Sequence, residues 1–348
     1  MSPINFSASS RYFAMPTSSV PIKFPKIVSV PISARKRHWL RHISTGGTGS
    51  MQGRDLLLIV SVMAIWGFNF SMIKLGVTGM DPLLIAAARF ACATFPIIFF
   101  IRRPKVPWRY LMGYGLLFGT GIWGMASCAI TFGLSSGMAS VLLQLDVLTT
   151  VLVGVLLYKE IISPRMWFGM GMALVGLVVS ILYTNGNVTP AGVAFILISA
   201  ICWPLAGVMV RQSGTRSPFA FNIWGMLFAP LPLIGLSLLF NGVEVLEITY
   251  RQWNAEAWIS VLFQAYPTTL FGYWVWNKML LKYPMSQMAP LTLLVSVFAL
   301  ASGYLIYGER LSAAQWVSCS AFLLGVGLVL YRGPLPGAAR AAGQKAAP

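Results

Sequence analysis

The stretch GMASVLLQLDVLTTVLVGVLLYKEIISPRMWFGMGMALVGLVVSIL at residues 137–182 decides the fold, because it recurs 149 positions later as SQMAPLTLLVSVFALASGYLIYGERLSAAQWVSCSAFLLGVGLVLY at residues 286–331. Both copies are apolar, yet they share residues that hydrophobicity alone does not explain. The matched pairs are Gly154 and Gly303, Tyr158 and Tyr307, Glu160 and Glu309, Ser163 and Ser312, Trp167 and Trp316, and Gly176 and Gly325. The sequence is therefore predicted to contain a duplicated membrane unit.

Composition places the chain in a membrane. Hydrophobic residues make up 57% of the sequence and charged residues 9%, with a mean hydropathy of +0.74. In a soluble globular domain about a quarter of the residues are charged. A soluble domain is therefore excluded.

The net charge of +17 indicates contact with anionic lipid, since the basic residues lie in loops and tails between apolar segments. We find no nucleic-acid module and predict no nucleic-acid partner. The four cysteines lie in apolar segments without a CxxC pair or a histidine nearby, so neither a disulfide framework nor a metal site is predicted. The sequence contains no Walker A run, which excludes ATP as the driving force, and we predict no cofactor.

Ten segments are long and apolar enough to be predicted as membrane spans. They are 56–77, 82–101, 110–132, 137–157, 165–183, 191–211, 218–240, 257–278, 285–307 and 313–331. We predict an all-α polytopic membrane protein with ten transmembrane helices, arranged as two inverted five-helix repeats at 52–183 and 190–332. Inverted repeats are typical of alternating-access transporters.

The two tails are predicted to be disordered and outside this unit. The first, 1–51, is basic and rich in Ser and Pro, and its first fifty residues contain no Asp or Glu; the second, 333–348, is rich in Ala, Pro and Gly. The N-terminal composition is similar to that of an organellar transit peptide. The interpretation we favour is that translation starts at Met51, just before the first span.

The distribution of Lys and Arg predicts that both termini are cytoplasmic. With that orientation the inner loops contain most of the bases, and the longest outer loop, near 241–256, contains three glutamates. Glu160 then lies on the inner side and its repeat partner Glu309 on the outer side, as inversion requires.

At this level of detail the chain resembles a known family. The residues that resemble it are Ile65 to Phe70 with Lys74, Pro82 with Arg89 and Phe90, Arg103 to Pro107, Gly113 to Gly115, Gly137 to Gln144, Ala289 to Leu291, and Glu309 with Arg310. Over roughly 52–332 the sequence resembles the EamA branch of the drug/metabolite transporter superfamily, and within it the bacterial O-acetylserine/cysteine exporters. The resemblance implies a multi-pass protein of the bacterial inner (cytoplasmic) membrane that exports small amino-acid metabolites. One position departs from the family pattern, since Asp146 stands where we expect a small or polar neutral residue.

Arg89 and Asp146 are the two charges that lie clearly within predicted spans, and such charges are functional candidates because of their insertion cost. At 1.5 Å per residue they lie at depths of roughly 10 and 14 Å, so they are predicted to be able to meet. Two interpretations stay open. The charges form a structural ion pair, or Arg89 attracts a substrate carboxylate while Asp146 holds the ammonium group or a coupling proton.

Trp66 and Asn69 are three residues apart near the middle of the first span, and Trp203 is the repeat counterpart of Trp66. An aromatic ring and an amide at this depth can hold a small zwitterion; helix packing is the alternative. Gln144, Gln264 and Tyr273 are weaker candidates for lining the same cavity.

Pro204 and Pro267 lie inside predicted spans, where each removes a backbone donor. They are candidates for gating, and passive kinks are the alternative. Within the family, the alternative function is that of an EamA-type permease for another amino acid, metabolite or drug. A polytopic membrane enzyme is the alternative from another class, but the sequence contains no HExxH motif and both histidines, His38 and His42, lie in the tail.

Overall fold

The computed structural model describes residues 52–158, 162–183, 188–283 and 288–330. Throughout these ranges the regular structure is helical, and they contain no strand. The predicted tails, 1–51 and 333–348, and Glu160 lie outside the described residues.

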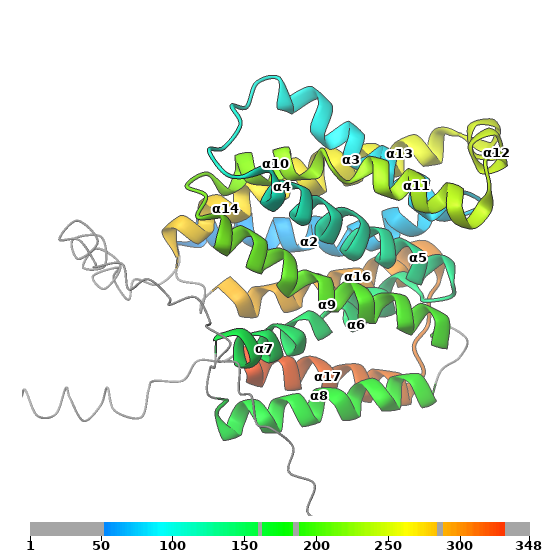
Figure 1. The fold of residues 1–348 in the computed structure, drawn as a ribbon. Coiled ribbons are helices and arrows are strands. Elements are labelled where there is room, and N and C mark those ends of the chain that lie inside the picture. Colours follow the sequence, from blue (N-terminus) through cyan, green and yellow to red (C-terminus); the bar gives the residue numbers. More distant parts are fainter. Residues whose placement is uncertain (1–51, 159–161, 184–187, 284–287, 331–348) are drawn as a thin grey trace, which may run out of the picture. The chain divides into compact units, whose positions relative to one another are not determined.

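Helices cover most of every predicted span. The first half contains α2 (Gly53–Val77), α3 (Pro82–Ile98), α4 (Trp108–Gly115), η1 (Leu116–Gly124), α5 (Met125–Thr131), α6 (Ser136–Leu143), α7 (Leu145–Tyr158) and α8 (Pro164–Leu182). The second half contains α9 (Pro190–Ser213), α10 (Pro218–Met226), α11 (Pro230–Asn241), α12 (Glu244–Gln252), α13 (Ala255–Phe263), η2 (Gln264–Phe271), α14 (Gly272–Lys282), η3 (Ala289–Thr292), α16 (Leu293–Tyr307) and α17 (Ala313–Leu330). Figure 1 shows their arrangement.

Within the described ranges, six helical segments are long and apolar enough to cross a membrane: Gly53–Val77, Trp108–Thr131, Ser136–Leu157, Pro190–Ser213, Pro218–Asn241 and Ala313–Leu330. Three further apolar helices are shorter, at Pro82–Ile98, Pro164–Val179 and Leu293–Tyr307. The full count of ten spans therefore stays a prediction. The predicted outer loop near 241–256 contains a short helix, α12, between α11 and α13, which the sequence did not predict. Its charged residues, Glu244, Glu247 and Arg251, recur at the helical spacing of three and four. They lower the hydropathy of the segment, so a search for long apolar spans overlooks this helix.

Equivalent helices of the two repeats begin in the same way. Ser163 precedes α8 and its hydroxyl accepts the backbone N–H of Met166 at 3.3 Å. Ser312, its repeat partner, precedes α17 and accepts the N–H of Gln315 at 3.2 Å. A serine at this position satisfies one of the free N–H groups of the first turn. The repeated Ser163/Ser312 pair therefore marks the same helix start in each half.

The helices α8 and α17 pack against each other through glycine, and they lie side by side in Figure 1. A Cβ added at Gly325 would lie 2.6 Å from the carbonyl oxygen of Gly169, and one added at Gly176 would lie 2.7 Å from that of Ser318. The repeat exchanges these two contacts, because Gly169 corresponds to Ser318 and Gly176 to Gly325. Such an exchange is what a two-fold relation between the helices produces. Small residues here allow the backbones to approach closely.

Two π-helices interrupt equivalent parts of the two halves. In η1 the chain continues from α4 into α5, and the N–H of Met125 bonds the carbonyl of Thr120, five residues earlier. In η2 the N–H of Gly272 bonds the carbonyl of Pro267 in the same way. The two segments begin 148 positions apart, within one residue of the repeat spacing. Short π-helical segments inside helices are frequent at functional sites.

Candidate functional site

Arg89 is the largest fully buried side chain of the described residues, with 1% of its surface exposed. It lies in the middle of α3 and points to η2, where Nη1 donates to Gln264 Oε1 at 3.3 Å and Nη2 donates to Thr269 Oγ1 at 3.1 Å. Both acceptors are uncharged. The Arg89 Nε makes no hydrogen bond.

The two acceptors are themselves held in place by the π-helix. The hydroxyl of Thr269 donates to the backbone carbonyl of Gln264 at 2.8 Å, so its lone pairs face the guanidinium. The amide nitrogen of Gln264 donates to Ser260 Oγ at 2.9 Å, which turns the amide oxygen toward Arg89. Thus η2 presents a fixed pair of neutral acceptors to a buried cation.

The ion pair between Arg89 and Asp146, one of the two predicted alternatives, is not formed. Three ion pairs are found in the described part of the chain, and neither residue takes part in them. Asp146 lies in the first turn of α7, where its Oδ1 is buried without a hydrogen bond. The guanidinium charge therefore has no carboxylate partner among the described residues. A buried, uncompensated charge is costly, and in membrane proteins such charges mark substrate or ion sites.

Two aromatic rings, those of Phe90 and Trp123, lie near the guanidinium. The Cζ of Arg89 lies 4.4 Å from the ring centroid of Trp123 in η1, within cation–π distance. The Trp123 ring belongs to a set of rings that contact one another, which we name the aromatic cluster. Its members are Trp66, Phe118, Trp123, Trp203 and Tyr273.

Each ring of the aromatic cluster lies near another. Trp66 and Tyr273 have centroids 5.3 Å apart, and Tyr273 and Phe118 5.6 Å. Trp203 lies 6.4 Å from Phe118 and 6.3 Å from Trp123. These separations are within the range of favourable ring contacts. Because the rings come from α2, η1, α9 and α14, both halves of the chain build the cluster.

The Trp66 indole in the first half forms a hydrogen bond to the second half. Its Nε1 donates to the backbone carbonyl of Thr268 in η2 at 3.0 Å. The approach requires a glycine opposite, since a Cβ at Gly272 would lie 2.4 Å from that nitrogen. Pro267, a predicted gating residue, lies in the same π-helix, whereas Pro204 lies inside α9, which continues without a break.

Five of the eight predicted binding or coupling residues lie together: Trp66, Arg89, Trp203, Gln264 and Tyr273. Asn69 is fully buried, and neither polar atom of its side chain makes a hydrogen bond. Gln144 separates α6 from α7 and donates its amide to the carbonyl of Thr292 at 3.2 Å. No described contact brings these two residues or Asp146 to Arg89.

Sequence reasoning missed Phe118, Trp123 and Thr269. The first two lie in a glycine-rich segment whose small residues indicate helix contact, and Thr269 carries no charge. Thr120 stands 149 positions before Thr269, at the repeat spacing, and Gly124 stands 148 positions before Gly272. These two matches are the signals that could have linked η1 to η2.

The comparisons with known proteins agree with this architecture. The family described as "EamA-like transporter family" matches the chain over residues 54–182 and 190–331, one match in each half. The chain belongs to the EamA-like transporter family. This EamA-like transporter is 33% identical over 282 residues to a protein of Salmonella typhimurium named "Probable amino-acid metabolite efflux pump", covering 79% of this chain and 94% of that protein.

Other relatives point the same way. An Escherichia coli protein of the same name is 32% identical over 282 residues, with coverage of 79% and 94%. The uncharacterized transporter YoaV of Bacillus subtilis is 26% identical over 284 residues, covering 77% of the EamA-like transporter and 95% of YoaV. One solved crystal structure has a TM-score of 0.54 at 18% identity, covering 80% of this chain and 96% of that one; it shows the fold alone. The family and these named relatives are transporters.

Proposed function

We propose that this chain exports small amino-acid metabolites, similar to O-acetylserine or cysteine, across the bacterial inner membrane by alternating access. In this proposal ten spans form two inverted five-helix repeats, and both termini are cytoplasmic. The names of the relatives support the substrate class, and the bases of the inner loops support the orientation.

The observation that carries the proposal is the buried Arg89 without a carboxylate partner, beside an aromatic cluster built by both halves. A substrate carboxylate supplies the missing negative charge and accepts two parallel N–H bonds from the guanidinium. The rings of the aromatic cluster face an ammonium group or an apolar side chain of the same molecule. Because α2 and η1 belong to one repeat and α9 and η2 to the other, rocking of the repeats changes the access to this position.

Flux into proteoliposomes tests the proposal. Purified protein is reconstituted and supplied with a panel of radiolabelled amino acids and their O-acetyl derivatives, with and without a pH gradient. We expect saturable transport of at least one of these solutes. The complete absence of flux of these solutes, with the protein shown to be inserted, would contradict the proposal. Flux that does not saturate with substrate concentration would indicate a channel.

The role of Arg89 is tested in the same assay. Arg89→Gln should lower transport at least about tenfold, since a hydrogen bond to a charged group contributes roughly 1.5–3 kcal/mol and about 1.4 kcal/mol is a factor of ten. Arg89→Lys keeps the charge but loses the planar fork, and should also be impaired. Arg251→Gln is the matched control, because Arg251 forms an exposed ion pair with Glu247, with side chains 75% and 66% exposed.

A further inference from the structure

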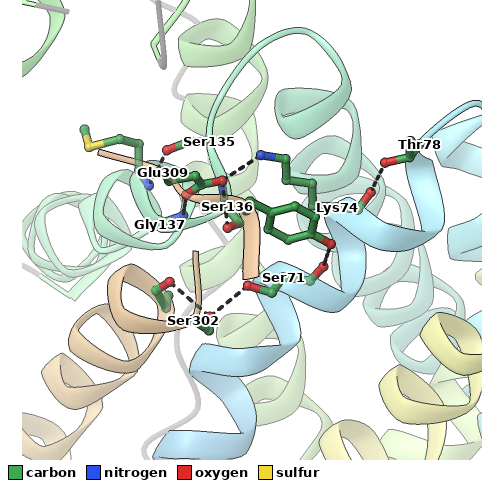
Figure 2. Close-up of polar contacts among 11 residues, drawn as sticks. Ser71, Lys74, Thr78, Ser135, Ser136, Gly137, Ser302 and Glu309 are labelled. Carbon is green, nitrogen blue, oxygen red and sulfur yellow. Dashed lines mark hydrogen bonds and ion pairs between the residues drawn. The ribbon is translucent and has the colours of Figure 1, made fainter. Parts of the chain in front are cut away.

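Glu309 joins three helices at one end of the bundle. It follows Gly308, which ends α16 in the left-handed conformation with φ of 62°. The turn is closed by the N–H of Glu309, which donates to the carbonyl of Gly303 at 3.2 Å. This geometry turns the carboxylate back toward the start of α6 and the end of α2, as Figure 2 shows.

The carboxylate accepts four hydrogen bonds. Oε1 accepts from Lys74 Nζ at 2.8 Å, from the backbone N–H of Ser136 at 2.9 Å and from its hydroxyl at 3.0 Å. Oε2 accepts from the N–H of Gly137 at 3.1 Å. We name Lys74, Ser136, Gly137 and Glu309 the Glu309 cluster.

The site is shaped for this carboxylate. A Cβ at Gly303 would lie 2.3 Å from Glu309 Oε2 and 2.9 Å from Ser136 Oγ, so a side chain at this position would displace the carboxylate. The Glu309 side chain is 10% exposed and that of Lys74 is 30% exposed. Partly buried charge pairs with several hydrogen bonds are screened less than exposed ones.

Further contacts extend the seam between α2 and α16. Ser71 Oγ lies 2.8 Å from Ser302 Oγ, and the Tyr307 hydroxyl donates to the carbonyl of Ser71 at 2.9 Å. Lys74 also lies over the Tyr307 ring, 4.4 Å from its centroid. Eight residues separate Lys74 from Trp66 on α2, about 12 Å along the helix. The Glu309 cluster thus lies at the end of the helix that carries part of the candidate site.

The opposite end of α2 is built differently. There Asp55 bonds Lys282 and Tyr283 at the end of α14. The Lys282 side chain is 47% exposed and lines a groove of about 580 Å³ together with Arg54, Asp55 and Lys278. The end of α2 that carries Asp55 is therefore the more open of the two.

We infer that the Glu309 cluster is a gate that holds the outer ends of α2, α6 and α16 together, and that it opens when the substrate position faces outward. The inference rests on the proposed alternating access and orientation. It requires that loss of the Glu309 charge favours the outward-open state, and that a covalent link across the cluster stops transport.

Cysteine labelling tests the gate without any substrate. The four native cysteines are replaced, and Ser302→Cys places a thiol beneath the cluster at a residue that is 7% exposed. A membrane-impermeant maleimide is applied to each face of sealed vesicles. Glu309→Gln should raise the labelling rate several-fold from the outer face alone, and Glu247→Gln, at an exposed ion pair, should not. Equal rates in the two variants, or a rise from the inner face, would overturn the inference.

A cross-link supplies the second arm, which does not depend on how well Glu309→Gln folds. In the Lys74→Cys, Glu309→Cys variant a short bis-methanethiosulfonate reagent joins the two positions. Transport should stop on cross-linking and return on reduction. Persistent transport in the cross-linked protein would overturn the gate. Absence of transport by the wild-type protein would instead count against the proposed function. The labelling experiment would still report on the gate in that case.

Discussion

The indole N–H of Trp66 donates to the backbone carbonyl of Thr268, which ties α2 of the first half to η2 of the second at 3.0 Å. The bond is possible because Gly272 leaves room for the ring: a Cβ at this position would lie 2.4 Å from the indole nitrogen. Trp66 is therefore both a member of the aromatic cluster and a link between the two halves.

Trp66→Phe keeps an aromatic ring but removes the donor. We expect the free energy of unfolding to fall by roughly 0.5–1.5 kcal/mol, the usual net contribution of one hydrogen bond, and transport to slow as well. Thermal unfolding in detergent measures the first effect and the proteoliposome flux the second. Trp316→Phe is the control, because Trp316 is 56% exposed; an equal loss in the two variants would contradict the role of the bond.

The internal repeat predicts the α8 and α17 helices well. Their starts at Ser163 and Ser312 and their contact glycines, Gly176 and Gly325, are conspicuous in the sequence because both copies keep them. By contrast, α12 is missed, since charged residues on one helical face lower the hydropathy on which span prediction depends.

Gly176→Leu should destabilise the protein by about 1–3 kcal/mol, the cost of forcing atoms into a packed interface. The physical reason is the backbone of Phe322 and Ser318, which lies 2.7 Å from a Cβ at this position. The control is Gly171→Leu on the same helix, where an added Cβ meets nothing within 4 Å. Thermal unfolding of both variants makes the comparison, and equal melting temperatures would contradict the close contact.

The candidate site could be predicted only in part. The depth of Arg89 follows from its position in the span, but depth along a helix axis does not say which way the side chain points. The ion pair with Asp146, one of the two interpretations left open, is for that reason replaced by bonds to Gln264 and Thr269. The π-helices also escape prediction, because glycine and proline in a span are equally compatible with a kink or with close packing.

The pH dependence of stability should reveal the charge of Glu309. Burial raises the pKa of its carboxyl, but hydrogen bonds from Lys74, Ser136 and Gly137 and the positive charge of Lys74 outweigh burial, so the pKa lies below its ordinary value of 4.5. The Tyr307 ring, beneath the Lys74 ammonium, also faces the cluster. Because the folded pKa is depressed, the stabilisation is present above the ordinary value and is lost as the pH falls through the folded pKa.

The melting temperature of the wild type should therefore exceed that of Glu309→Gln at pH 7, and the difference should shrink as the pH is lowered from 5 to 3. Unfolding scans of both proteins across this range make the measurement. Glu247→Gln, which alters an exposed pair, should show little difference from wild type throughout. A difference between wild type and Glu309→Gln that stays constant with pH would mean that the carboxylate charge does not hold the cluster.

Asp146 is an acid near the middle of a predicted span, with one carboxylate oxygen buried, and we predict that it couples transport to protons. Asp146→Asn keeps the shape of the side chain but cannot titrate. It should abolish acceleration of transport by a pH gradient and leave substrate exchange at equal pH intact. Proteoliposome uptake with and without the gradient separates the two, and Glu256→Gln, at an exposed acid, is the control.

The absence of an Arg89–Asp146 ion pair makes the prediction sharper. Because Asp146 Oδ1 has no hydrogen bond, Asp146→Asn breaks no bond at that atom. Combined with Arg89→Gln, it should change the free energy of unfolding by the sum of the single effects, within the roughly 0.5 kcal/mol expected for independent sites. Rescue of one substitution by the other would show that the two charges interact, and a gradient response that survives Asp146→Asn would assign the coupling proton to another group.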